Sequence, residues 1–521
     1  MNLASKTRRF QARSAHLMNL VASVGKFSAW LTLTTAGKTF AAILLLLLGG
    51  VLTLFIVAIV SLNRREDLSI WHKIVLEEEF TVACGDKTLA DYLSRENRLF
   101  AELEDRIYAH TPPEEVNATI IHRFRKGSPA DPTTHSKNWN RTFELKPEGG
   151  SATCGVLLLH GMSDSPYSLR AVGERLHREG AHVLGLRLPG HGTAPSGLLE
   201  FTRKDMDAAV KIGVRHLHEQ LGDKPLFLAG YSNGGALAIH YGLETMEDNS
   251  LPKISGIVLL SPAIGVSPMA ALAVWQGRIG HWLGLEKLAW TMIAAEYDPY
   301  KYNSFAVNAG DQVYRLTVEI GKHLDRLEST GKLDDFPPLL AFQSAVDATV
   351  STPALIAGLF SRLPGDQHEL VLFDINRIGQ IESFVTNDPR KHLADLIRSV
   401  QKPFALTVLT NHDHSSLALE ERHFERTRLT PEISDPGLTW PPGVYSLSHV
   451  AVPFSPEDPI YGNGLGPDHR EAKFQIGNIV LRGEKNVIQI SPVDQLRLRW
   501  NPFYPWLEER VVKFVGERTA R

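Results

Sequence analysis

Apolar residues form an uninterrupted run near the start of the chain. Residues 40–60 contain no charged side chain and consist mainly of Leu, Ile, Val and Phe. A helix over this run is about 31 Å long at about 1.5 Å per residue, which matches the hydrocarbon core of a bilayer. A buried core helix and a cleaved signal peptide are the alternatives, but the apolar region of a signal peptide is shorter. The pattern therefore favours a transmembrane signal anchor over residues 39–61.

After residue 150, short apolar runs alternate with segments of helical periodicity. The runs that read as strands are residues 155–159, 182–188, 225–229, 257–260, 338–342, 370–373 and 405–409. Between them, Ser165 with Pro166 and Thr202 with Asp205 are typical helix starts. Strands that alternate with helices predict βαβ units, and hence an α/β fold with a mostly parallel sheet.

Two segments depart from this alternation. Residues 62–110 are rich in Glu, Arg and Leu and predict a helical stalk, after which a globular domain extends over residues 111–521. A long block at about 264–336 separates two strands and contains Trp275, Trp282 and Trp290. That composition suits a lid over an apolar pocket, and an ordinary helical subdomain would look the same.

Charge is uneven along the chain. The net charge is only −3, which gives no indication of nucleic-acid binding. Residues 1–38, however, carry Lys and Arg side chains and neither Asp nor Glu. Because positive segments stay in the cytoplasm, we expect a cytoplasmic N-terminus and an extracytoplasmic domain, in a periplasm or an ER lumen. Cys84 and Cys154 could pair in such a compartment, or Cys154 could be a buried apolar residue.

A serine at the end of one predicted strand has the surroundings of a nucleophile. Gly230-Tyr-Ser232-Asn-Gly234 follows the strand at 225–229 and opens a helix. A serine hydroxyl needs an exposed position and a base to react, and a tight strand-to-helix turn flanked by glycines provides the exposure. The loop His160-Gly161-Met162 follows another strand. We predict that the backbone N–H groups of Met162 and Asn233 form an oxyanion hole.

The segments LLLHGMSDSP, LRLPGHG and GYSNGG together resemble the α/β-hydrolase superfamily, in particular its monoacylglycerol lipases, lysophospholipases and carboxylesterases. The resemblance covers residues 150 to about 350. It implies an eight-stranded, mostly parallel sheet, a cap after the sixth strand, and a catalytic triad in the order Ser, acid, His. His191 in the second segment corresponds to a turn element of the family, so we expect a structural role near the pocket rim.

The resemblance places the acid on a loop after a strand, which matches Asp347 in the segment 342–350. Asp374, at the end of another strand, is the alternative. The position of the base differs from the family pattern, because no suitable histidine follows the acid at the usual distance in the sequence. We favour His449, which is flanked by small residues, over His412 and His414. This choice makes residues 360–440 an insertion.

Together, these expectations predict a membrane-anchored hydrolase that cleaves a lipid-like or amphipathic ester. Ser232 would attack, His449 oriented by Asp347 would act as base, and the membrane would be engaged through residues 40–60. The sequence implies no organic cofactor and no metal, since the His412/His414 pair has no third zinc ligand nearby. Acyl transfer to another acceptor, peptide cleavage and a silent envelope scaffold are the alternatives, and the oligomeric state is undetermined.

Overall fold

The computed structural model has two compact units, Met1–Glu66 and Asp67–Arg521. The described residues are 39–50, 53, 65–117, 119–149, 151–265, 285–379, 395–396, 403–464, 475–477 and 497–520.

In the first unit, residues 39–50 are helical. Their apolar side chains are exposed, with Leu46 at 75%. Within the described residues, no helix combines the length and apolar character needed to cross a bilayer. The basic segment 1–38 and much of the predicted anchor, at residues 51–52 and 54–60, lie outside the described residues.

The second unit is built on one sheet, in the strand order β1-β3-β2-β4-β5-β8-β9-β10-β11-β12. The strands are β1 Phe143–Leu145, β2 Gly155–Leu159, β3 His182–Leu186, β4 Leu226–Tyr231, β5 Gly256–Leu260, β8 Leu339–Ser344, β9 His368–Phe373, β10 Ala405–Asn411, β11 Leu419–Phe424 and β12 Glu432–Ser434. Strands β2 to β5 and β8 to β10 pair in parallel, whereas β1, β11 and β12 pair antiparallel.

The expectation of eight strands was wrong for the described part of the chain, where the sheet has ten. Strand β1 extends one edge, and the β11–β12 hairpin extends the other. The expected insertion at 360–440 contains four strands of the sheet, of which β9 and β10 include the predicted runs 370–373 and 405–409. The polar, half-buried residues of β11 are the reason that apolar periodicity did not reveal this extension.

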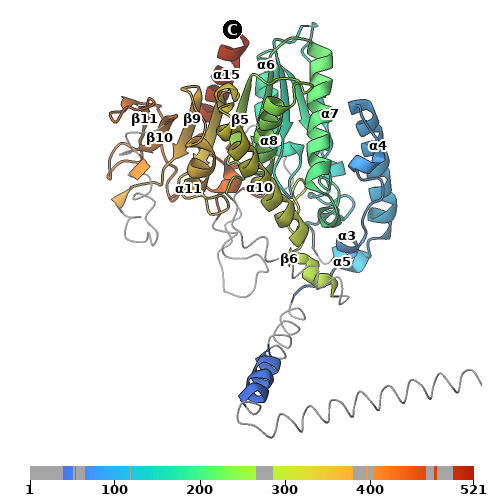
Figure 1. The fold of residues 1–521 in the computed structure, drawn as a ribbon. Coiled ribbons are helices and arrows are strands. Elements are labelled where there is room, and N and C mark those ends of the chain that lie inside the picture. Colours follow the sequence, from blue (N-terminus) through green and yellow to red (C-terminus); the bar gives the residue numbers. More distant parts are fainter. Residues whose placement is uncertain are drawn as a thin grey trace, which may run out of the picture. The chain divides into compact units, whose positions relative to one another are not determined.

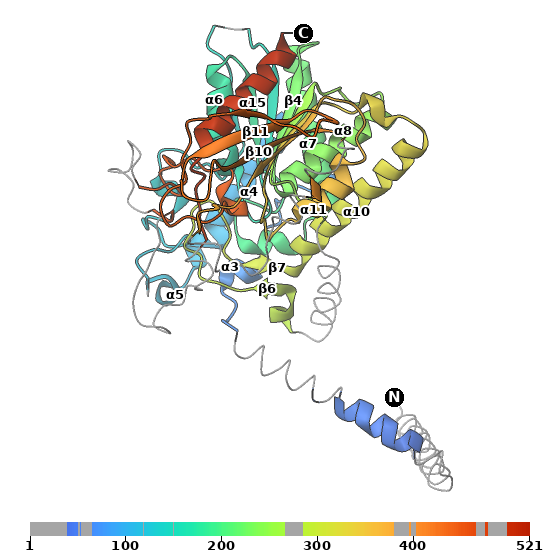
Figure 2. The ribbon, with the colours of Figure 1, turned by 90° about the vertical axis from the view of Figure 1, so that its left-hand side faces the viewer.

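Helices cover both faces of the sheet because successive strand residues point to opposite sides. On one face, Leu157 and Leu228 pack with the helices α7 (Arg203–Leu221), α8 (Asn233–Glu247) and α10 (Val307–Ser329). On the other, Val156 and Phe227 pack with α6 (Arg170–Arg178) and α15 (Tyr504–Thr519). Figures 1 and 2 show this sandwich of helices around the sheet.

The predicted cap range of 264–336 is divided in the structure. Its C-terminal part is α10, which buries Leu316, Ile320 and Leu324 in the sheet-facing core beside α8. Residues 290–306 form a short hairpin, β6 (Trp290–Met292) with β7 (Phe305–Ala306). The remaining segment at 266–284, which includes Trp275 and Trp282, lies outside the described residues.

The predicted stalk packs on the globular unit from Asp67 onward. It contains α3 (Ile70–Lys73) and α4 (Leu89–Arg106), and α5 (Pro113–Asn117) follows. Tyr92 of α4 donates a hydrogen bond to the carbonyl of Arg187 at 2.6 Å. The guanidinium of Arg187 contacts Glu79 at 2.9 Å and Glu96 at 3.2 Å, and its side chain is 1% exposed. A buried ionic cluster therefore joins this segment to the strand β3 region.

The two cysteines do not form a disulfide in the structure. Cys154 is buried directly before β2, as a small apolar residue would be, and burial raises the pKa of its thiol. The thiol of Cys84 lies 3.3 Å from the hydroxyl of Thr81, in the turn before α4. The reading of Cys154 as a core residue agrees with this arrangement.

Candidate active site

Ser232 occupies a sharp turn between β4 and α8. Its backbone has φ 53° and ψ −116°, a region that non-glycine residues rarely adopt. Such a conformation costs about 1–3 kcal/mol and persists only where the surrounding structure enforces it. Here the N–H of Ser232 donates to the carbonyl of Leu260 at 3.0 Å, and its carbonyl accepts from Ala263 at 2.9 Å. The turn is therefore locked between β4, α8 and the end of β5.

The glycines of the motif are required by close backbone packing. A Cβ at Gly230 would lie 2.4 Å from the carbonyl oxygen of Gly234. A Cβ at Gly234 would lie 1.9 Å from the carbonyl oxygen of Leu159, at the end of β2. Both distances are impossible for real atoms, so side chains at these positions would force the turn open. The predicted reason for the Gly-x-Ser-x-Gly pattern is thus visible in the packing.

The structure brings Ser232, His449 and Asp347 together. His449 Nε2 lies 3.1 Å from Ser232 Oγ, and His449 Nδ1 lies 2.8 Å from Asp347 Oδ2. With its proton on Nδ1, the imidazole donates to the carboxylate and accepts from the serine hydroxyl. The ring of Tyr231 packs against His449, with 5.4 Å between centroids. The side chain of His449 is only 5% exposed, so its orientation is fixed.

Asp347 is held by three further groups of its own loop and strand. Its Oδ1 accepts from the N–H groups of Thr349 and Val350 at 2.8 and 2.9 Å, and Oδ2 accepts from Gln343 Nε2 at 3.0 Å. Burial raises the pKa of Asp347, but His449 and these N–H groups lower it by more, so the net pKa is below its usual value. The carboxylate therefore stays ionised beside the imidazole.

The sequence did not reveal Gln343, which positions the acid and does not itself react. It is the one polar side chain in the otherwise apolar stretch that opens β8, Leu339-Leu-Ala-Phe-Gln343, and it is fully buried. A buried polar residue at a strand end beside a candidate acid is the signal that could have found it. Its amide fixes one oxygen of Asp347, so it is a positioning residue.

The alternative acid and bases lie elsewhere. Asp374, after β9, contacts Arg377 and accepts from Thr410 at 2.8 Å. The exposed imidazole of His412 lies 3.3 Å from Asp413, and His414 Nδ1 lies 3.1 Å from the carbonyl oxygen of Arg377. The structure thus brings neither histidine to Ser232, whose hydroxyl is contacted by His449.

The two predicted oxyanion-hole residues flank the nucleophile. Asn233 is the first residue of α8, and Met162 lies in the loop after β2. A Cβ at Gly161 would be 3.3 Å from Ser232 Cβ, so this loop runs against the serine. The tight approach fits a donor from each side of the nucleophile, and the roles of Met162 and Asn233 stay predictions.

Two buried histidines hold the loop that contains Met162. His160 Nε2 accepts from the N–H of Leu188 at 3.0 Å, while its Nδ1 donates to the carbonyl of Gly161 at 2.8 Å. His191 Nδ1 lies 2.8 Å from the carbonyl of Pro189, and Nε2 lies 3.2 Å from Met162 Sδ. Burial lowers the pKa of His160 far below its usual value and that of His191 to about 4. Both rings stay neutral, as structural elements would.

A buried charged group lies next to the same loop and was not anticipated. Asp164 is 1% exposed, and its Oδ2 lies 3.6 Å from Lys301 Nζ. Burial raises the pKa of Asp164 to about 6, although Lys301 acts in the opposite direction. The N–H of Tyr302 also donates to the carbonyl of Ser163 at 2.7 Å. The segment before β7 therefore buttresses the loop that carries Met162.

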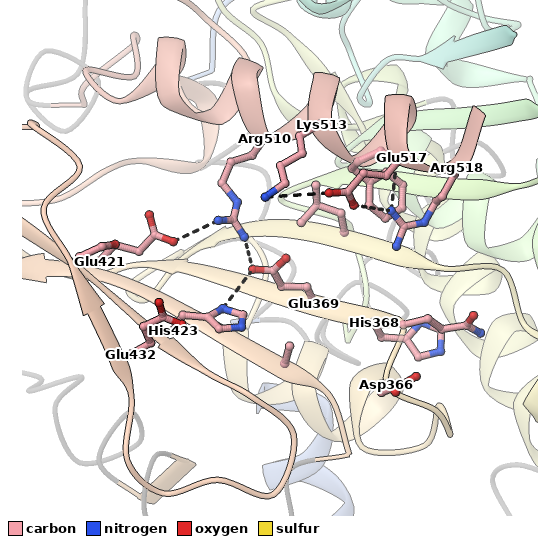
Figure 3. A pocket seen from close by; sticks show the side chains of 15 residues that line it. Asp366, His368, Glu369, Glu421, His423, Glu432, Arg510, Lys513, Glu517 and Arg518 are labelled. Atoms are coloured by element: carbon pink, nitrogen blue, oxygen red, sulfur yellow. Dashed lines mark hydrogen bonds and ion pairs between the residues drawn. The ribbon is translucent and has the colours of Figure 1, made fainter. Parts of the chain in front are cut away.

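A separate cavity of about 450 Å³ lies at the far side of the sheet, between α15 and the strands β9 to β12. Figure 3 shows its charged lining, in which Arg510 reaches Glu369 and Glu421. Neither Ser232 nor its partners line this cavity. It is therefore distinct from the candidate active site.

Comparison with known proteins relates the part of the chain that contains Ser232 and Asp347 to a family. A family described as serine aminopeptidase S33 matches residues 151–375. A thermostable monoacylglycerol lipase from Bacillus sp. (strain H-257) is 26% identical over 217 residues, which are 42% of this chain and 79% of the relative. Phospholipase YtpA from Bacillus subtilis (strain 168) is 30% identical over 116 residues, which are 21% of this chain and 41% of that protein.

Solved structures are similar in part. The monoacylglycerol lipase of Paleococcus ferrophilus is 21% identical with a TM-score of 0.34, and the match covers 45% of this chain and 88% of that chain. A soluble variant of monoglyceride lipase from Saccharomyces cerevisiae is 15% identical with a TM-score of 0.36, covering 45% and 82%.

Proposed function

The chain belongs to the α/β-hydrolase superfamily and is a serine ester hydrolase of the lipase and esterase type, and from this premise we propose that it works through an acyl-enzyme on Ser232. The observation that carries the proposal is the imidazole of His449. It lies within hydrogen-bonding distance of both Ser232 Oγ, at 3.1 Å, and Asp347 Oδ2, at 2.8 Å.

The reaction has two steps. His449 takes the hydroxyl proton as Ser232 attacks the ester carbonyl, and Asp347 stabilises the imidazolium that forms. The N–H groups of Met162 and Asn233 hold the negative oxygen of the tetrahedral intermediate. The imidazolium then protonates the leaving alcohol. A water molecule, deprotonated by the same imidazole, releases the acyl group and restores the serine.

The substrate we propose is a lipid-like or amphipathic carboxylic ester. The support is the monoacylglycerol lipase among the relatives, together with the apolar composition of the segment between β5 and α10. Peptide cleavage uses the same triad, and the serine aminopeptidase description of the matched family favours it as the second candidate. The fold alone does not select between these substrates.

The proposal is tested with a fluorophosphonate probe and a substrate panel, using the full chain in detergent. We expect the probe to label wild type and not Ser232→Ala, whose fold is checked by circular dichroism. Wild type should hydrolyse monoacylglycerols and p-nitrophenyl esters faster than aminoacyl p-nitroanilides. If folded wild-type protein is not labelled, the chain is a silent scaffold; faster cleavage of the anilides would identify a peptidase.

We further propose that residues 40–60 anchor the hydrolase in a membrane, with residues 1–38 in the cytoplasm. The supports are the uncharged apolar run, the basic segment before it, and the exposed apolar side chains of residues 39–50. We expect a periplasmic phosphatase reporter fused after Arg65 to be active and a cytoplasmic fluorescent reporter to be dark in a bacterial host. The reverse result would overturn the orientation, and a fusion recovered in the soluble fraction would overturn the anchor.

A further inference from the structure

Three side chains that could bind a metal converge far from the catalytic serine. Glu144 Oε1 lies 2.7 Å from His182 Nε2 and 2.7 Å from His216 Nε2. The three candidate ligand atoms all lie within 4.8 Å of one another. Among the described residues, no other group of histidine, cysteine and acidic side chains converges in this way.

The fold positions these side chains before any ion arrives. In the antiparallel pair of β1 and β3, Glu144 is opposite Leu184, and His182 lies two residues from Leu184. Residues two apart on a strand share a face, so Glu144 and His182 point to the same side of the sheet. His216 lies on α7, which packs against that side through Val214 and Leu217. Each ligand thus comes from a different rigid element.

The surroundings suit a partly shielded ion. The side chains of His182, His216 and Glu144 are 5%, 18% and 25% exposed, so an ion can enter from solvent and still be largely enclosed. The other oxygen of Glu144 lies 3.4 Å from Lys146 Nζ, which leaves Oε1 directed at the two rings.

Two imidazoles and one carboxylate form a donor set that suits Zn²⁺, which binds His nitrogen and carboxylate oxygen in tetrahedral sites. Bond lengths of about 2.0–2.2 Å in tetrahedral geometry separate ligand atoms by roughly 3.3 Å, so the ligands need to move apart by about half an ångström. We propose that Glu144, His182 and His216 bind a Zn²⁺ ion, with water as a fourth ligand, and that the ion fastens strand β1 to β3 and α7.

The role of this ion is structural. Strand β1 is a three-residue edge strand, so few ladder hydrogen bonds hold it. His182 is the first residue of β3, whereas Ser232 follows the last residue of β4, so the two sites lie at opposite ends of the parallel strands. The ion therefore stabilises the sheet edge and takes no part in ester hydrolysis.

The test measures Zn²⁺ binding by the full chain after removal of metals with a chelator and dialysis. We compare wild type with His216→Ala and Glu144→Gln, and use His218→Ala, an exposed histidine on the same helix, as the matched control. Wild type and His218→Ala should bind one more Zn²⁺ per chain than the two site variants, or bind it at least about 100-fold more tightly. Zn²⁺ should also raise the Tm of wild type by several degrees and leave that of His216→Ala unchanged.

Substitution by Co²⁺ supplies a second readout, because tetrahedral Co²⁺ absorbs visible light when it has protein ligands. The spectrum should appear with wild type and His218→Ala only. The proposal is overturned if wild type binds no more Zn²⁺ than His216→Ala, since the three side chains then form only a hydrogen-bonded cluster. Esterase activity does not enter the comparison, so this result is independent of the catalytic proposal.

Discussion

His449→Ala is expected to lower kcat on p-nitrophenyl esters by about 10⁴- to 10⁶-fold, because Ser232 then has no base to take its proton. KM should change little, since the imidazole is proposed to act on the serine and not to hold the substrate in its ground state. His414→Ala is the matched control, and it should keep the activity of wild type. Initial rates at saturating ester concentration measure both variants.

Loss of the imidazole also leaves Asp347 buried without the Nδ1–H donor of His449. Asp347 then keeps only its backbone and Gln343 donors, so a modest drop in Tm is expected. Circular dichroism separates this drop from unfolding. Full activity in His449→Ala, or a loss confined to His414→Ala, would move the base to the 412–414 loop and discard the assignment made here.

Gly234→Ala is expected to destabilise the fold by at least about 3 kcal/mol, or to prevent folding. The added methyl group would lie 1.9 Å from the carbonyl oxygen of Leu159, which is backbone and cannot move without shifting β2. Any protein that does fold should fail to react with fluorophosphonate, because the turn that presents Ser232 is displaced. Chemical denaturation and probe labelling report the two effects.

Gly321→Ala provides the control for this second variant. Gly321 lies within α10, and a Cβ there meets no atom within 4 Å. Alanine has the higher helix propensity, so Gly321→Ala should be as stable as wild type or more stable by about 0.5–1 kcal/mol. Equal stabilities of Gly234→Ala and wild type would contradict the packing argument for the motif.

Much of the sheet could be predicted from apolar runs. The expected strands at 155–159, 257–260 and 370–373 lie within β2, β5 and β9. These strands are buried on both faces, so they read as continuous apolar segments. Strand β11 could not be predicted from apolar runs, because its central residues Glu421, Arg422 and His423 are polar and half-buried. Arg510, from the distant helix α15, pairs with Glu421. The two residues of this ion pair are far apart in the chain, so the sequence does not reveal the contact.

The candidate site also has a part that is visible in the local sequence and a part that depends on long-range contacts. Ser232 could be found locally, because its glycines are neighbours in sequence and their packing imposes the motif. His449 lies 217 residues from Ser232 and 102 from Asp347, so no local pattern joins them. The sequence could only rank it by its small neighbours. Glu144, His182 and His216 show no ligand spacing at all, because three separate elements bring them together.

The buried pairing of Arg187 with Glu79 and Glu96 determines where the folding unit begins. The region matched by the family starts at residue 151, yet a chain cut there would lose both carboxylates that pair with the guanidinium. An isolated charge in an apolar interior is far more costly than the same charge in a pair. We therefore expect a fragment that folds alone to begin near Asp67, where the compact unit begins, because the segment before residue 151 supplies part of its interior.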